Sequence, residues 1–324
     1  MCAGAARERG ICVNVLSLSL TSERGPGYGI VQRLFFAIAV LALIGQRHEA
    51  ALAKPVEEAI KVAVQAANIY RKEVAQDIVV TLVHDDATAS PRPLLLLQHG
   101  RAADANGRAA LGRARYSVNA EWFAKLGFLV AVPTRVGYGE SAGEDIEDTG
   151  SCNRKTYAPA FIAVARQTEA VIALLRKRAD VLPDRAVVVG QSFGGAGAIA
   201  LAAAAPNGVQ AVINFAGGGG GNPKTNPGSP CDPVQLRRTF AGFGESARMP
   251  SLWLYTENDL FFGPSLPLQW FEAYKAAGGN GEFVQFPATG EDGHSLFTQA
   301  PQLWRKKVIE FLRAVGYDNL PVAP

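Results

Sequence analysis

The chain has 324 residues, of which 48% are hydrophobic and 19% charged, with a formal net charge of +3. This composition excludes a mainly disordered chain, because such chains combine low hydrophobicity with high net charge. The small, dispersed charge argues against a nucleic-acid-binding protein. The sequence also has no glycine at every third position, no long heptad run and no apolar stretch of about 18 residues, which excludes collagen, coiled coils and multi-span membrane proteins.

The N-terminal segment has the features of a secretory signal peptide. Its apolar run, 34–45, is 12 residues long and follows Arg33, whereas a membrane-spanning helix needs roughly 20 residues. Ala51-Leu52-Ala53 then supplies the small residues of a cleavage site. A buried N-terminal helix is the alternative interpretation of this run.

The signal peptide predicts the organisation and location of the protein. We expect residues 1–53 to be a leader and 54–324 a single folded domain, periplasmic or secreted, with no stable membrane span after cleavage. Because the stretch before the apolar run is long for a signal peptide, we also expect the true start to lie downstream of Met1, with Val31 as a candidate.

Two of the four cysteines remain after the leader. Cys2 and Cys12 lie within it, whereas Cys152 and Cys231 lie in loop-like contexts of the folded part. An even number of cysteines in an exported protein favours a disulfide between them. Two unpaired buried thiols are the alternative.

Apolar patterning predicts an alternation of strands and helices. In chain order, the predicted elements are helix Lys54–Lys72, strand Asp77–Val83, strand Pro93–Gln98, helix Tyr116–Leu126, strand Phe128–Pro133, helix Ala158–Ala179, strand Ala186–Gly190, helix Phe193–Ala204, strand Gln210–Phe215, helix Pro233–Phe243, strand Ser251–Tyr255, helix Leu266–Ala277, strand Glu282–Phe286 and helix Pro301–Val315. Several strands are apolar on successive residues, as expected when both faces of a parallel sheet are buried. The pattern predicts an α/β fold with a mostly parallel central sheet and helices on both faces.

Two Gly-x-Ser-x-Gly motifs compete for the role of nucleophile. Ser192 follows the apolar strand and opens the small-residue helix after it, which is the context of a strand-to-helix nucleophile elbow. Gly190 and Gly194 are needed there because a Cβ would collide with the neighbouring elements. Ser141 lies in a polar loop well past a strand. We therefore predict Ser192 as the nucleophile; a plain helix N-cap is its alternative role.

The same glycine-rich region has two weaker interpretations. Residues 195–200 fit a loose dinucleotide-binding pattern, but no Asp or Glu occurs between Ala186 and Cys231 to bind a ribose. The run 217–221 is expected to be a loop, because Lys224-Thr225 follows too loosely for a phosphate-binding loop.

A serine nucleophile needs a base and an acid to orient that base. His294 is the only histidine after Ser192, and it lies between the last strand and the last helix. Asp259 follows a strand, at the sheet edge where ligands bind. The chain order Ser, Asp, His is that of α/β-type hydrolase triads. Glu257 and Asp292 are the competitors of Asp259.

The negative charge that develops during acyl transfer needs positioned N–H donors. We predict the backbone amide of Phe193, directly after the nucleophile, and that of Arg101, after the strand Pro93–Gln98. His99 is expected to be a structural residue of this loop.

Together these residues resemble the α/β-hydrolase superfamily, and within it dienelactone-hydrolase-like and related serine esterases or prolyl-oligopeptidase-type enzymes. The segments that carry the resemblance are HGR at 99–101, PTRVGYGESAG at 133–143, GQSFGG at 190–195, TENDLF at 256–261 and EDGHSLF at 291–297. The resemblance extends over roughly residues 75–316. It implies that the protein needs no metal or organic cofactor. Dienelactone hydrolases themselves use a cysteine nucleophile, where this chain has Ser192.

The predicted function is hydrolysis of a small-molecule carboxylic ester through an acyl-enzyme formed on Ser192, with His294 as base and Asp259 as its partner. The alternatives are a serine peptidase of prolyl-oligopeptidase type on the same triad and a non-catalytic binding protein on a hydrolase fold. The oligomeric state stays open.

The acidic loop between Gly137 and Tyr157 contains Cys152. If Cys152 pairs with Cys231, two loops of the active site are joined and shape its entrance. A solvated charged loop is the alternative.

Overall fold

The computed structural model describes residues 55–318 and residue 320, all within one compact unit of the chain. The predicted leader, its apolar run at 34–45 and the cysteines Cys2 and Cys12 lie outside the described residues.

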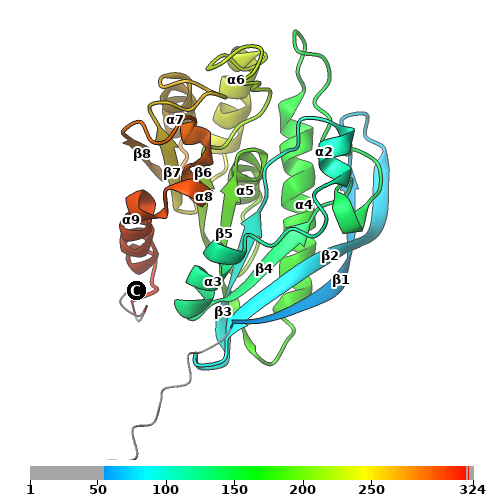
Figure 1. The fold of residues 1–324 in the computed structure, drawn as a ribbon, viewed down its shortest axis with the longest axis vertical. Coiled ribbons are helices and arrows are strands. Elements are labelled where there is room, and N and C mark those ends of the chain that lie inside the picture. Colours follow the sequence, from blue (N-terminus) through cyan, green and yellow to red (C-terminus); the bar gives the residue numbers. More distant parts are fainter. Residues whose placement is uncertain (1–54, 319, 321–324) are drawn as a thin grey trace, which may run out of the picture. The chain divides into compact units, whose positions relative to one another are not determined.

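An eight-stranded sheet forms the centre of the fold, in the order β1-β2-β4-β3-β5-β6-β7-β8. The strands are β1 (Pro55–Ala67), β2 (Glu73–Asp85), β3 (Arg92–Gln98), β4 (Leu129–Thr134), β5 (Val181–Gln191), β6 (Val209–Phe215), β7 (Ser251–Thr256) and β8 (Gly281–Phe286). The pairs β1–β2 and β2–β4 are antiparallel and all the others are parallel. Figure 1 shows β1 and β2 at one edge and β8 at the other. The predicted, mostly parallel α/β sheet is confirmed.

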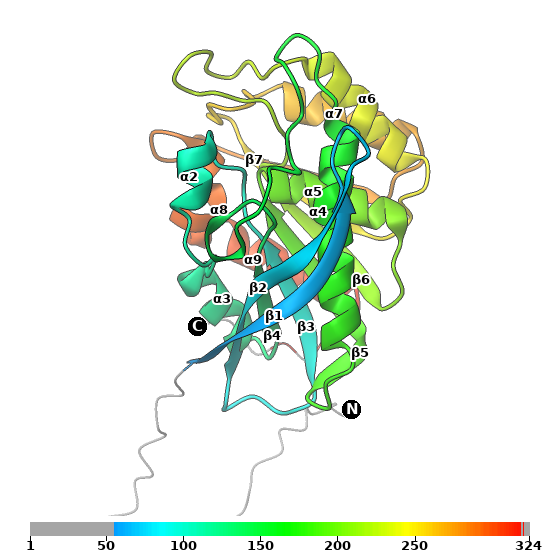
Figure 2. The same cartoon turned by 90° about the vertical axis from the view of Figure 1, so that its right-hand side faces the viewer.

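Helices cover both faces of the sheet (Figure 2). They are α2 (Ala105–Ala109), α3 (Ser117–Lys125), α4 (Tyr157–Leu175), α5 (Phe193–Ala204), α6 (Pro233–Gly244), α7 (Leu266–Ala276), α8 (Leu296–Gln299) and α9 (Pro301–Ala314). Two 3₁₀ turns, η1 (Gly139–Ser141) and η2 (Gly293–Ser295), complete the elements. The short helices α2 and α8 were not predicted, because so few residues carry no helical periodicity.

Successive residues of the central strands face two separate cores. Leu94 and Leu96 of β3 belong to the core with α4, α5, α6 and α7, whereas Leu95 and Leu97 belong to the core with α3, α8 and α9. Side chains alternate between the faces of a strand, so a strand buried on both faces must be apolar throughout. This explains the leucine run of β3.

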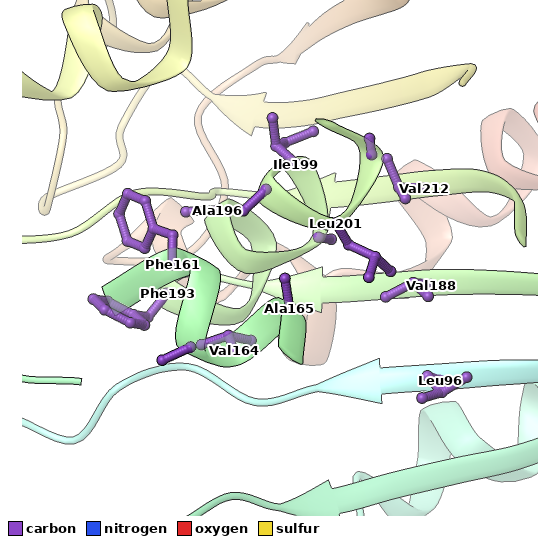
Figure 3. Close-up of a cluster of buried hydrophobic side chains, with 14 of the residues drawn as sticks. Leu96, Phe161, Val164, Ala165, Val188, Phe193, Ala196, Ile199, Leu201 and Val212 are labelled. Carbon is purple, nitrogen blue, oxygen red and sulfur yellow. The ribbon is translucent and has the colours of Figure 1, made fainter. Parts of the chain in front are cut away.

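The packing of α4 and α5 on the sheet is tight (Figure 3). Phe161 and Val164 of α4 lie beside α5 and share one buried cluster with Val188 of β5 and Val212 of β6. A Cβ on Gly197 would overlap the Val164 side chain, so glycine lets the two helices approach. By length and composition α4 could cross a membrane, but 56% of its most apolar window is buried within the domain, as for a core helix.

The predicted helix over Lys54–Lys72 is wrong, because this segment forms strand β1. Every residue of β1 pairs with β2, and burial alternates: Val62 and Val64 are buried whereas Lys61 and Ala63 are exposed. Ala, Glu, Lys and Gln favour helices intrinsically, and this preference concealed the two-residue period. Pairing with β2 outweighs it, since strand preference depends mainly on context. The other predicted strands and long helices are present, with shifted ends.

Candidate active site

Ser192 occupies a sharp turn between β5, which ends at Gln191, and α5, which begins at Phe193. Its backbone has φ +55° and ψ −123°, a region that non-glycine residues rarely adopt. The turn is held from both sides, because the Ser192 amide donates to the Phe215 carbonyl (2.8 Å) and the Ser192 carbonyl accepts from the Gly218 amide (3.2 Å). The strand, turn and helix thus form a nucleophile elbow.

The flanking glycines of this turn are required by space. A Cβ on Gly190 would overlap the backbone of Gly194, and one on Gly194 would overlap the carbonyls of Gln98 and His99. The elbow therefore packs directly against the loop that follows β3, which brings that loop to the nucleophile.

The side chains of Ser192, His294 and Asp259 form a hydrogen-bonded chain. His294 Nε2 lies 3.0 Å from Ser192 Oγ, and His294 Nδ1 lies 3.0 Å from Asp259 Oδ2 and 3.2 Å from Oδ1. His294 is 6% exposed and Asp259 only 1%. Since an ionised carboxylate only accepts, Nδ1 carries the proton in the neutral ring and Nε2 presents its lone pair to the serine hydroxyl. This arrangement can remove the Ser192 proton.

Asp292 fixes the two loops that carry the acid and the base. Its Oδ1 accepts from the amide of Leu260 (3.0 Å) and from the amide of His294 (2.9 Å), so it joins the Asp259 loop to η2. Asp259 Oδ1 in turn accepts from the amides of Phe261 and Phe262. Of the two competitors, Asp292 therefore binds backbone amides, and Glu257 is exposed.

Two phenylalanines enclose the imidazole, and the sequence analysis missed both. The Phe261 ring stacks on the His294 ring with centroids 3.9 Å apart and an interplanar angle of 22°. Phe262 approaches edge-on at 5.2 Å. Their position two and three residues after the predicted acid was the available signal. The two rings restrict the imidazole to the plane that faces Ser192.

The predicted oxyanion donors lie next to the nucleophile along the chain or in space. Gly100 contacts Ser192 so closely that a Cβ on it would be 3.2 Å from Ser192 Cβ and 3.7 Å from Oγ. The next amide is that of Arg101, while the Phe193 amide opens α5. Within residues 55–318, neither amide donates to a protein acceptor. Neither amide is therefore engaged by another group among these residues.

The Arg101 side chain is partly buried and held by ion pairs. It donates to both oxygens of Asp145 (2.8 and 2.6 Å), which also pairs with Arg108 at 3.1 Å, and its guanidinium lies 5.7 Å from the centre of the Phe193 ring. Burial alone would lower the pKa of Arg101, but the Asp145 carboxylate holds that pKa above its ordinary value. Arg101 thus stays charged and anchored.

Ser141, in the second motif, lies apart from the catalytic side chains. It is 9% exposed, donates to the Thr134 carbonyl and accepts from the Val79 amide at 2.8 Å. These bonds hold η1 against β2 and β4, which is a structural role.

The acidic loop between Gly137 and Tyr157 is partly buried and partly exposed. Cys152 forms a disulfide with Cys231, as predicted. Glu147 is fully buried, and its carboxylate binds Arg135 and Tyr138. Glu140, Glu144 and residues 151–154 are exposed, so the alternative of a solvated charged loop holds for part of this segment but not for Glu147.

Between residues 55 and 318, no group of three or more His, Cys, Asp or Glu side chains is arranged to hold a metal ion. The fold, the elbow after β5 and the hydrogen-bonded Ser192, His294 and Asp259 define the protein as an α/β hydrolase.

Comparisons with known proteins agree with this class. Residues 89–259 match the family model described as serine aminopeptidase, S33. Because the match covers more than half of the chain, the protein belongs to this family of α/β hydrolases. A comparison with curated proteins finds no match.

Solved structures share the fold at low sequence identity. The α/β hydrolase GrgF from Penicillium sp. sh18 is 15% identical, with a TM-score of 0.54 over 80% of this chain and 98% of the other. A protein from Klebsiella pneumoniae subsp. pneumoniae described as a dienelactone hydrolase is 14% identical, with a TM-score of 0.52 over 80% and 99%. An acetyl xylan esterase from Paenibacillus sp. R4 is also 14% identical, with a TM-score of 0.51 over 86% and 93%.

Proposed function

We propose that the protein hydrolyses carboxylic esters through an acyl-enzyme on Ser192. The observation that carries the proposal is the continuous hydrogen-bonded chain from Ser192 Oγ through both nitrogens of His294 to Asp259. Esterase and dienelactone hydrolase functions among structures of the same fold support the ester as substrate.

In the first half-reaction, Ser192 Oγ bonds to the ester carbonyl carbon while His294 Nε2 takes the hydroxyl proton. The carbonyl oxygen becomes an oxyanion that the amides of Phe193 and Arg101 stabilise. When the intermediate collapses, the bond to the alcohol oxygen breaks and His294 returns its proton to that oxygen. In the second half-reaction, His294 takes a proton from water as the water oxygen bonds to the acyl carbon. The bond from that carbon to Ser192 Oγ then breaks, His294 returns its proton to Oγ, and the acid leaves.

A serine aminopeptidase is the second candidate, because that is the description of the matching family model. An aminopeptidase must bind the α-ammonium group of its substrate, which a free carboxylate does best. Asp145 and Glu147, the acids that contact the Arg101 side chain, are both occupied by arginines. Neither of these two acids is free to bind an ammonium group.

The test compares the turnover of p-nitrophenyl esters of short acids with that of amino acid p-nitroanilides whose α-amino group is free. We expect ester turnover that Ser192→Ala lowers by about 10⁶-fold, as for loss of a comparable nucleophile, and that Ser141→Ala leaves unchanged. Faster anilide than ester turnover would favour the aminopeptidase. Equal ester turnover by the wild type and Ser192→Ala would refute the mechanism.

We also propose that the protein is exported after removal of residues 1–53. The Cys152–Cys231 disulfide supports this, because disulfides persist in oxidising compartments. Mass spectrometry of the N-terminus of the protein recovered from its native cell tests it; a chain that retains residues 1–53 in the cytoplasm would contradict it.

A further inference from the structure

The loop that follows β3 is held by a fully buried ion pair that the mechanism above does not use. Arg135, just after β4, and Glu147 both have fully buried side chains. Arg135 donates to both Glu147 oxygens through Nε and Nη2, and Tyr138 donates its hydroxyl to Glu147 Oε2 at 2.8 Å. All the groups needed to neutralise Glu147 therefore lie within this cluster.

One nitrogen of Arg135 does not serve Glu147. Its Nη1 donates to the His99 carbonyl at 2.7 Å, and the Arg135 backbone amide donates to His99 Nε2 at 3.3 Å. His99 Nδ1 in turn donates to the Gly100 carbonyl at 2.7 Å. Arg135 thus holds both the main chain and the ring of His99, and His99 holds Gly100.

This chain of contacts ends at the nucleophile. Gly100 lies close to Ser192. The next amide in the chain, that of Arg101, is the proposed donor to the oxyanion. A buried ion pair is weak evidence for stability, because a packed apolar pair often serves the fold as well. The contacts of Arg135 with the His99 carbonyl and ring have a different consequence. They fix the direction of the peptide between His99 and Gly100.

We propose that Arg135 and Glu147 are positioning residues for the oxyanion hole. Glu147 orients the Arg135 guanidinium, and Arg135 orients the His99-Gly100 backbone so that the Arg101 N–H points to the oxyanion. The inference rests on the proposed function, since it concerns the same site. A displacement of about 1 Å at a reacting centre can lower the rate about 10²-fold.

The experiment removes the polar cluster without leaving a buried charge. The triple variant Arg135→Met, Tyr138→Phe, Glu147→Leu replaces Glu147 and the two residues that hydrogen-bond to it with apolar side chains of similar volume. Arg101 keeps its pairing with Asp145, so folding does not depend on an unpaired ion. Arg135→Lys is the second variant, because its ammonium group cannot reach both Glu147 and the His99 carbonyl in the way a guanidinium does. Ser141→Ala is the matched control, since it removes buried hydrogen bonds after the same strand without contact to His99.

Three readouts separate positioning from structure. We expect each variant to lower kcat for a p-nitrophenyl ester by about 10²-fold with KM within about twofold, and to slow phosphonylation of Ser192 by a fluorophosphonate about equally. The pH at half-maximal labelling should not move, because the triad is intact. Ser141→Ala should match the wild type in all three.

The outcomes are distinct. A wild-type protein that the fluorophosphonate does not label would contradict the proposed function itself. A labelled wild type together with either variant folded, by circular dichroism, and within about threefold of wild-type kcat would overturn this inference alone. If the triple variant does not fold, Arg135→Lys decides the question by the same criterion.

Discussion

The ring of Phe261 lies face to face with the imidazole of His294, with centroids 3.9 Å apart. Phe261 belongs to the loop whose amides bind Asp259, so one loop positions both the acid and the base. The ring covers one face of the imidazole, while Phe262 meets it edge-on. Aromatic stacking of this kind contributes about 0.5–1.5 kcal/mol beyond burial.

Replacing Phe261 with leucine should therefore lower ester kcat by about two- to tenfold, because the imidazole gains freedom to leave the Ser192 hydroxyl. Phe261→Tyr keeps the ring and is the matched control, with kcat close to that of the wild type. The measurement is kcat at saturating p-nitrophenyl ester. Equal kcat for the leucine and tyrosine variants would show that stacking does not position His294.

Two glycines should respond oppositely to the same change. A Cβ on Gly190 would overlap the Gly194 backbone, whereas one on Gly242, exposed near the end of α6, meets nothing within 4 Å. Gly190→Ala should destabilise the protein by about 3 kcal/mol or more, because backbone cannot move aside as a side chain can. Gly242→Ala should stabilise it by about 0.5–1 kcal/mol, since alanine is the better helix former. Urea unfolding measures both; a Gly190→Ala protein as stable as the wild type would contradict the packing of the elbow.

The disulfide closes a long segment of chain, because Cys152 and Cys231 are 79 residues apart. Loop-closure entropy predicts that it contributes about 4 kcal/mol to the free energy of unfolding. The double variant Cys152→Ser, Cys231→Ser should lose this amount in urea unfolding, and the wild type should lose the same amount in a reducing agent. The variant itself should not respond to the reductant. A wild type that is equally stable with and without reductant would contradict this prediction.

Much of the site follows from local patterns in the sequence. The apolar run of β5 and the small residues of α5 define the turn that exposes Ser192, and chain order selects Asp259 and His294 from their competitors. Ser192 and Asp259, predicted from positions far apart in the chain, each lie within hydrogen-bond distance of His294.

Other features depend on partners that no local pattern shows. The β1 segment has helix-forming residues, and only its pairing with β2 makes it a strand. Glu147 belongs to a segment whose composition suggests a solvated acidic loop. Its burial is explained only by its contacts with Arg135 and Tyr138. Contacts between residues distant in sequence decide both cases.

His99 makes the folded protein sensitive to acid. Burial, reinforced by the neighbouring Arg135 charge, holds its pKa well below 6.5, and its Nε2 must stay unprotonated to accept from the Arg135 amide. Below about pH 6.5 the unfolded chain therefore binds a proton that the folded protein does not. The free energy of unfolding consequently decreases as the pH decreases. The slope from one such group is about 1.4 kcal/mol per pH unit. In urea unfolding of the full chain between about pH 5 and 7.5, the stability advantage of the wild type over His99→Gln should shrink as the pH falls, slightly above pH 6.5 and at close to that slope near pH 5, because all other titrating groups are shared. Parallel stability curves for the two proteins would mean that folded His99 takes up the proton as readily as the unfolded chain does.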